Sequence, residues 1–214
     1  MLLALSGTDA CGKTTLAKRL ASEHGFRYVK RPDRSTDIGQ ILDQFIKGKR
    51  VFNKDPNINE HAAQLLFGAN NLDGMSEMMD ALDAGANLVC DRYVADGVVY
   101  HSQAVGKDRR EFIEGLNAGM PKPDLHIVLE VPYDIAQARL EQRGDAKERN
   151  DNPETHAKVT QGFRDYFPDA VFIDASGTPD EVLGQVMEAM AKHELRNAMF
   201  YDGEGARLMC REIY

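Results

Sequence analysis

The amino-acid sequence predicts an α/β fold in which a doubly wound parallel sheet carries helices on both faces. Short apolar runs alternate with segments of helical periodicity along most of the 214 residues, a pattern typical of parallel sheets that are covered on both sides. The first apolar run leads directly into the glycine-rich stretch "GTDACGKTT" at 7–15, and a helical pattern follows it. This order of strand, loop and helix is typical of phosphate-binding α/β proteins.

The predicted strands are short and almost wholly apolar. Short apolar runs between turn residues favour buried strands of a parallel sheet. They lie at 2–5, 26–29, 87–91, 125–131 and 171–176.

The predicted helices have apolar residues at intervals of three and four positions. Asn59 is the expected N-cap of the longest helix, and Thr178, Pro179 and Glu181 form a capping pattern at the start of the last one. The first three helical segments begin near 16, 36 and 59 and end at Gly25, Gly48 and Gly85, and the fourth covers about 133–142.

Length and composition indicate one domain over 1–214. The last stretch, 194–214, shows no clear period and receives no role.

A formal net charge of −8 argues against a protein that binds nucleic acid through a basic surface. No apolar run is long enough for a membrane span and no signal peptide is visible. Cys11, Cys90 and Cys210 show neither metal-ligand spacing nor an even set for disulfides, so we expect a cytoplasmic protein.

The glycine-rich stretch has the residues that a phosphate-binding loop requires. Gly7 and Gly12 allow the backbone to curl its N–H groups around an anion, and the following helix adds its partial positive charge. Lys13 is expected to reach the terminal phosphates, and Thr14 is expected to bind Mg²⁺. A chance glycine turn is the alternative, but the strand, the lysine and two threonines favour phosphate binding.

Two loop residues need separate explanations. A carboxylate beside phosphates is repulsive, so Asp9 is expected to bind something else, such as a sugar hydroxyl, unless it only stabilises the turn. The helix start and Lys13 would lower the pKa of Cys11, but a small residue that fills the loop is the favoured interpretation.

A second cluster of functional residues follows the apolar run 87–91. Asp91 ends this run, where ligands gather in doubly wound sheets, and its carboxylate is a candidate Mg²⁺ ligand. Arg92 is suited to bridging two phosphate groups. A structural Asp–Arg pair is the alternative. Arg34, just before a predicted helix, is a further candidate for a phosphate contact, or else a solvated loop residue.

Five segments, in order and spacing, resemble the successive motifs of the thymidylate kinase family: "GTDACGKTT", "RPDRSTDIG", "LLFGANNLD", "DRYVADGVVY" and "GMPKPDLHIVLEV". The resemblance covers the chain to about Lys192. It implies a nucleoside monophosphate kinase fold with a five-stranded parallel sheet and a lid. It also implies transfer of a phosphoryl group from MgATP to dTMP, giving dTDP and ADP, and a homodimer packed through helices.

The resemblance also implies individual roles. Asp9 would bind the acceptor's 3′-hydroxyl, Arg34 its phosphate and Phe67 its base. Tyr100 would crowd the 2′ carbon and so favour deoxyribose. Arg92 would bridge acceptor and donor. The acceptor set is completed by Asn71, Asp96 and Gly97, and the ATP set comprises Gly7, Ala10, Cys11, Gly12, Lys13, Thr14, Thr15, Arg143, Ser176 and Gly177.

A polar, cation-rich stretch is expected to form a mobile lid at about 143–153. Its candidate cations are Arg139, Arg143, Lys147 and Arg149. Some thymidylate kinases carry an arginine in the phosphate loop where this chain has Ala10. The catalytic cation is therefore expected from the lid, as Lys147 or Arg149. The alternative is an ordinary solvated helix end whose arginines, Arg139 among them, pair with neighbouring carboxylates.

Two residues depart from the family pattern, and both concern base recognition. Asn71 stands where an arginine usually donates to the thymine 4-carbonyl, and Asp96 stands where serine or asparagine is usual. An ionised Asp96 accepts only, and would take the ring N–H of thymine or uracil, or the N–H groups of guanine. Alternatives are therefore a kinase with altered or broad base specificity for dUMP, dGMP or a modified base, a deoxynucleoside kinase with Asp9 as base, and a non-catalytic regulator.

Overall fold

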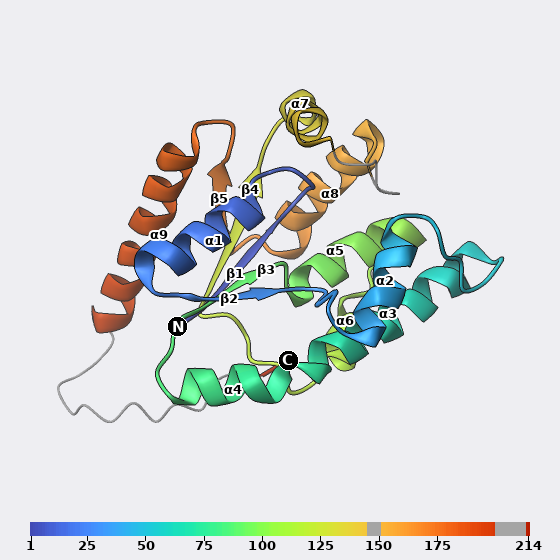
Figure 1. Ribbon diagram of the computed structural model, residues 1–214, viewed down its shortest axis with the longest axis horizontal. Helices are drawn as coiled ribbons and strands as arrows, with labels where there is room; N and C mark the ends of the chain where they lie inside the picture. The colour runs from blue at the N-terminus through green and yellow to red at the C-terminus, as the bar shows by residue number, and fades with distance from the viewer. Residues whose placement is uncertain (145–150, 200–212) are drawn as a thin grey trace.

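A computed structural model describes residues 1–144, 151–199 and 213–214, and its described strands form one parallel sheet of five, as the sequence predicts (Figure 1). The strand order is β2-β3-β1-β4-β5, with β1 in the centre. All six residues of β1 are buried. The strands are β1 (Leu2–Gly7), β2 (Arg27–Lys30), β3 (Leu88–Asp91), β4 (Leu125–Glu130) and β5 (Val171–Asp174).

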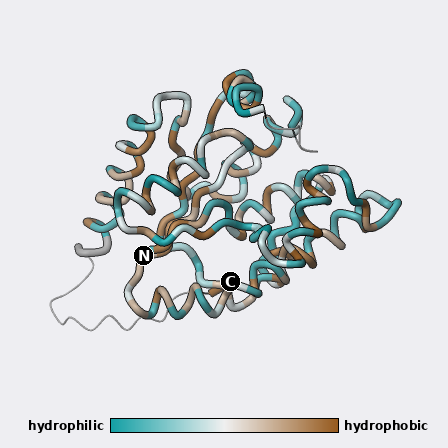
Figure 2. Tube along the Cα trace, viewed as in Figure 1, coloured by the Kyte–Doolittle hydropathy of each residue, from teal (hydrophilic) through white to brown (hydrophobic). Residues whose placement is uncertain are grey.

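Helices cover both faces of the sheet, so the doubly wound architecture is confirmed. Leu3 and Leu5 face a core shared with α1 (Lys13–His24) and α9 (Pro179–Met199). Leu2 and Ala4 face the opposite core, because side chains alternate along a strand. The opposite core is built with α4 (Met75–Asp83) and α5 (Val94–Val105), and α8 (Pro153–Tyr166) also packs on this side. Figure 2 shows apolar residues concentrated along the sheet between these helices.

The remaining helices surround the edge of the sheet where the parallel strands end. Beyond α5, a group of helices projects from the sheet on the right of Figure 1, and α7 lies at the top of the view. The projecting group comprises α2 (Asp37–Ile46), α3 (Pro56–Asp73) and α6 (Arg110–Leu116), and α7 covers Tyr133–Arg143. None of the helices in the described ranges is long and apolar enough to cross a membrane.

The single long helix predicted from Asn59 to Gly85 is wrong, because the structure has two helices there. Asp55 is the N-cap of α3, accepting from the backbone N–H of Asn57 at 2.8 Å, and Pro56 takes the first position. Asn59 instead accepts from the N–H of Phe52 in the preceding loop. Helix α3 ends before Gly74 and α4 begins after it. A Cβ at Gly74 would come within 2.8 Å of the Arg31 guanidinium.

Helices α5, α6 and α8 were not predicted as helices. Buried residues surround much of α5, so it lacks the one-sided stripe that a surface helix shows. The predicted tail from 194 is partly helical, since α9 runs to Met199, and Ile213 pairs with Pro121 in a short bridge. Of the predicted lid, Arg143 ends α7 and Asn152 caps α8, while 145–150 lies outside the described residues.

Several predicted helix ends are confirmed. Gly25 adopts a left-handed conformation after α1, with φ of 72°. Thr36 caps α2 by accepting from the N–H of Gly39 at 3.1 Å. Thr178 and Glu181 bind each other's backbone N–H groups at 3.3 and 2.7 Å at the start of α9.

His101 on α5 is a buried polar side chain with an unusual environment. Neither ring nitrogen has a hydrogen-bond partner within the described part of the chain. The ring contacts His61 edge-on, with the two ring centroids 4.9 Å apart. Burial, with help from His61 and Arg109, lowers the pKa of His101 from 6.5 to about 4. The folded protein therefore holds this imidazole in its neutral form.

This pKa shift makes stability depend on pH. Below the ordinary pKa of 6.5 the unfolded chain binds a proton that folded His101 refuses until about pH 4, so the free energy of unfolding falls across this window. Between about pH 7 and pH 5 we expect the free energy of unfolding to fall by about 1–2 kcal/mol more in the wild type than in a His101→Phe variant. Urea unfolding at the two pH values measures the difference. His24→Phe, an exposed site at the end of α1, should behave as the wild type, and a parallel loss in His101→Phe would contradict the assignment.

Candidate active site

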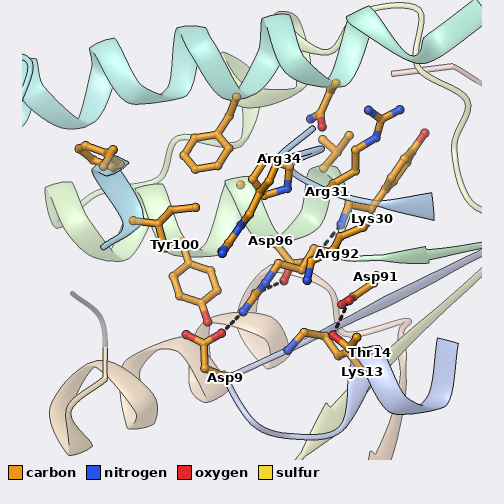
Figure 3. A pocket seen from close by; sticks show the side chains of 18 of the residues that line it. Asp9, Lys13, Thr14, Lys30, Arg31, Arg34, Asp91, Arg92, Asp96 and Tyr100 are labelled. Atoms are coloured by element: carbon orange, nitrogen blue, oxygen red, sulfur yellow. Dashed lines mark hydrogen bonds and ion pairs between the residues drawn. The ribbon is translucent and has the colours of Figure 1, made fainter. Parts of the chain in front are cut away.

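A cavity of about 570 Å³ lies at the edge of the sheet where β1, β2 and β3 end. Figure 3 shows Lys13, Arg34, Arg92 and Asp9 around this hollow. The cavity therefore brings together three of the predicted phosphate-binding cations. It is lined by the predicted site residues Asp9, Ala10, Gly12, Lys13, Thr14, Thr15, Arg34, Phe67, Asn71, Asp91, Arg92, Asp96, Gly97, Tyr100 and Arg143.

The loop after β1 is curled by residues in left-handed conformations. Gly7 and Gly12 have φ of 136° and 103°, and Ala10 has φ of 58°. A Cβ at Gly7 would come within 2.3 Å of the Leu129 carbonyl oxygen on β4, so only glycine fits there. Lys13 folds back over the loop and donates to the carbonyls of Thr8 at 2.6 Å and Gly7 at 3.1 Å. The loop is thus closed around its own lysine, which lies at the cavity.

Cys11 points away from the cavity. Its side chain is buried in the core beside β1 and α1, and Lys13 lies 3.3 Å from its sulfur. This position agrees with the interpretation of Cys11 as a small residue that fills the loop, and any contact with a ligand would have to come from its backbone.

One carboxylate oxygen of Asp91 accepts hydrogen bonds from two hydroxyl groups. Thr14 donates to Asp91 Oδ2 at 2.5 Å and Tyr28 donates to the same atom at 3.1 Å. Burial and the charge of Asp91 raise the pKa of Tyr28, so the phenol stays protonated as a donor. Tyr28 was not predicted: it lies on β2 in a run that reads only as strand, and its contact depends on the pairing of β2 with β3.

Arg92 is fixed by contacts on several sides. Its backbone is left-handed, with φ of 71°, a conformation that is uncommon for non-glycine residues and that clusters at functional sites. The guanidinium donates to Asp9, to Asp96 Oδ1 at 2.7 Å and to the Gly7 carbonyl at 3.2 Å. It also lies over the Tyr100 ring, 5.2 Å from the centroid. Arg92 therefore connects the phosphate loop to α5.

The charges around Arg92 stabilise one another. Burial opposes the charged form of Asp9, but Arg92 and Lys13 hold the pKa of its carboxyl below the ordinary value. Burial likewise opposes the charged form of Arg92, but Tyr100 and the neighbouring carboxylates raise its pKa well above the ordinary value. Asp9 and Arg92 are consequently ionised together.

Asp96 lies behind Arg92, where it is only 5 % exposed. Its Oδ1 accepts from Arg92, and its Oδ2 accepts from Ser6 Oγ at 2.7 Å and from the backbone N–H of Tyr93 at 3.2 Å. Both oxygens are therefore engaged with protein donors, which favours a role in holding Arg92 over a direct contact with a base.

The far side of the cavity is built by α2, α3 and α6. Arg34 forms an ion pair with Asp43 on α2, with 2.8 Å between Nη1 and Oδ1. Phe67 and Asn71 line the cavity from α3, and the Asn71 amide donates to Asn117 Oδ1 at 2.7 Å. Asn117 was not predicted as a site residue, because nothing in its local sequence distinguishes it from a helix end.

The predicted adenine-side residues lie around α7 and the loop after β5. Arg139, read as one of the lid cations, instead donates to the carbonyls of Ala175 at 2.9 Å and Ala10 at 3.4 Å. It thereby ties the loop after β5, which contains Ser176 and Gly177, to the phosphate loop. Arg143 lines the cavity from the end of α7. Lys147 and Arg149 lie outside the described residues.

The comparisons with known proteins agree with this geometry. The thymidylate kinase from Danio rerio is 32 % identical over 190 residues, which cover 85 % of each chain. The thymidylate kinase from Schizosaccharomyces pombe is 29 % identical over 210 residues, covering 92 % of this chain and 95 % of that protein. A solved structure of a Candida albicans thymidylate kinase, described as having broad substrate specificity, superposes with a TM-score of 0.74 at 26 % identity over 90 % of this chain and 92 % of that one. The family model for thymidylate kinase matches residues 5–186, and the chain belongs to this family.

Proposed function

We propose that the protein transfers the γ-phosphoryl group of ATP to dTMP, giving dTDP and ADP. The observation that carries the proposal is the position of Arg92, which donates to the Gly7 carbonyl of the phosphate loop and lines one cavity together with Lys13, Arg34 and Phe67. Membership of the thymidylate kinase family supports dTMP as the acceptor.

The chemistry requires alignment and charge neutralisation more than proton transfer. The phosphate of the acceptor is already anionic, so no general base has to activate it. Lys13 binds the terminal ATP phosphates, Arg34 binds the acceptor phosphate, and Arg92 bridges the two groups as charge spreads over the transferring oxygens. Because Asp9 and Asp96 fix Arg92, little reorganisation is needed when the reaction occurs.

Thr14 and Asp91 are the residues that would hold Mg²⁺. They offer a hydroxyl and a carboxylate oxygen 2.5 Å apart beside the phosphate loop, and such oxygen donors, few in number and supplemented by phosphates and water, suit this ion. When bound, Mg²⁺ neutralises phosphate charge and orients the oxygens of the phosphoryl group.

The remaining roles follow the family pattern. Asp9 binds the 3′-hydroxyl of the acceptor, Phe67 stacks on its base, and Tyr100 and Gly97 border its sugar. On the donor side, backbone groups of the loop hold the ATP phosphates, Arg143 lies against adenine, and Lys147 or Arg149 supplies a further cation. The backbone groups are those of Gly7, Ala10, Cys11, Gly12 and Thr15, with Ser176 and Gly177 around the base. A cytoplasmic location remains a prediction from the cysteine content.

The functional unit that we propose is a homodimer joined through α3. Ile58, Leu65 and Leu72 are 53, 55 and 38 % exposed, and their spacing of two helical turns places them along one side of the helix. This apolar stripe also carries the exposed Ala69. From sequence alone Leu65 and Ala69 could equally belong to the core, but both are exposed, which favours contact with a second copy.

Acceptor preference tests the proposed reaction. In a coupled assay of ADP release, we expect dTMP to give the highest kcat/KM among dTMP, dUMP, dGMP, dCMP and thymidine, because the family and the cavity fit a deoxynucleoside monophosphate. ATP binding without ADP release from any acceptor would indicate a regulator. Turnover of thymidine alone would indicate a deoxynucleoside kinase.

An Asp96→Asn variant tests the role of the carboxylate behind Arg92. We expect kcat to fall about tenfold or more with little change in ATP affinity, because Arg92 loses an ionic partner. If Asp96 acts through Arg92, kcat falls by the same factor with dTMP, dUMP and dGMP. A loss that depends on the base would instead indicate direct base contact. Glu23→Gln breaks the equivalent Arg19–Glu23 pair on the surface of α1 and should leave kcat unchanged.

Sedimentation of a Leu65→Glu variant tests the dimer. A charge at the centre of the apolar stripe would be buried without a partner, so we expect the variant to sediment as a monomer at concentrations where the wild type is a dimer. Leu195→Glu, which changes an equally exposed leucine on α9, is the matched control and should remain dimeric. A monomeric wild type would contradict the proposal.

A further inference from the structure

Arg31, at the end of β2, is a buried cation whose charge adds to the hydrogen bonds from Ser35 in lowering the pKa of the Asp33 carboxyl. The residue is 6 % exposed, and its backbone N–H donates to the Asp91 carbonyl at 3.0 Å, so its position is set by the sheet. No carboxylate of the described residues forms an ion pair with it. Burial of a guanidinium without a direct ion pair is unfavourable, and natural proteins normally compensate it.

The protein satisfies only part of the hydrogen-bonding capacity of this guanidinium. Nη1 donates to the carbonyl of Asn70 at 3.1 Å, near the end of α3 where the helix carries partial negative charge. Nη2 lies 3.2 Å from the sulfur of Met78, a weak acceptor. Nε is buried and has no partner among the described residues. With five N–H groups on an arginine, donors remain for a ligand.

The chain makes specific room for Arg31. A Cβ on Gly74, between α3 and α4, would come within 2.8 Å of Nη2 and 3.0 Å of Nη1. The break between these helices therefore accommodates the guanidinium. The arrangement brings a positive charge beside Asn70, one residue from the position where the family usually carries an arginine and this chain carries Asn71.

Arg31 also lines the cavity, at the end away from the phosphate loop. Its polar contacts are with α3 and α4, whereas Lys13 and Arg92 contact the loop. Figure 3 shows the Arg31 side chain directed away from Lys13 and Asp9, beyond Arg34. An acceptor whose phosphate is bound by Arg34 and Arg92 would extend its base toward this end, where Phe67 and Asn71 also line the wall.

We propose that Arg31 is a specificity residue that donates to an oxygen on the outer edge of the acceptor's pyrimidine, either the 4-carbonyl or an oxygen-bearing substituent at position 5. The inference rests on the proposed reaction and adds the residue that selects the base. Thymine and uracil offer an acceptor at position 4, whereas cytosine presents an amino group that cannot accept. Arg31 therefore favours 4-oxo-pyrimidines over cytosine.

The test compares base preference in wild type and Arg31→Met. For each protein, kcat/KM and the equilibrium Kd are measured with dTMP, dUMP, 5-hydroxymethyl-dUMP and dCMP. We expect Arg31→Met to lower kcat/KM for dTMP about ten- to a hundredfold and to change kcat/KM for dCMP little. The preference for dTMP over dCMP then shrinks by that factor. Equal losses of kcat/KM for dTMP, dUMP and 5-hydroxymethyl-dUMP identify the 4-carbonyl as the partner. A larger loss for 5-hydroxymethyl-dUMP identifies the substituent.

Matched variants separate this role from a structural one. Arg109→Met removes another arginine whose Nε is buried without a described partner, but one outside the cavity lining, and should retain the wild-type preference. Adding Asn71→Arg to Arg31→Met returns a guanidinium from α3 and should restore part of the preference. If Arg31 only anchors the end of α3, Arg31→Met lowers kcat/KM for all four acceptors, 5-hydroxymethyl-dUMP and dCMP included, by the same factor, and the proposal is overturned. Turnover of dTMP by the wild type tests the reaction itself, independently of these variants.

Discussion

The register between β1 and β3 is the constraint on which the rest of the site depends. Leu5 pairs with Asp91, and the N–H of Arg92 donates to the Leu5 carbonyl at 2.9 Å. Because both strands are parallel, the loops that follow them leave the same edge of the sheet next to each other. A shift by one residue would turn every side chain of β3 to the opposite face, and Arg92 would no longer meet the phosphate loop.

The site has two halves that are held by different parts of the fold. The donor half is the loop between β1 and α1, which is tied to the β5 side by Arg139. The acceptor half is carried by α2, α3 and α6, which lie beyond the sheet edge (Figure 1). Arg92 joins the two halves. Its left-handed backbone is held by the pairing of β1 with β3 and by the ion pairs of its guanidinium with Asp9 and Asp96.

Much of this organisation could be predicted from the sequence because it depends on local patterns. The strands are short apolar runs, and Lys13 and Thr14 follow a spacing that is typical of phosphate-binding loops. The break at Gly74 could not be predicted, because the apolar period continues across it and the reason for the glycine is the distant Arg31. Tyr28 and Arg31 were likewise not predicted, because each acts through a neighbouring strand or helix. Tyr28 lies in a plain strand pattern, and Arg31 opens the segment "RPDRSTDIG", in which only Arg34 was singled out. Asp96 was noticed, but its partners Ser6 and Arg92 come together only in the folded sheet.

The space at Gly74 implies that positions 31 and 74 are energetically coupled. With arginine at 31, even the single methyl group of alanine at 74 would force the guanidinium to move. With a shorter side chain at 31, the same methyl group would fill an empty volume and cause no clash. Relatives of this chain that lack the arginine should therefore be free to vary at position 74, and the two positions should change together.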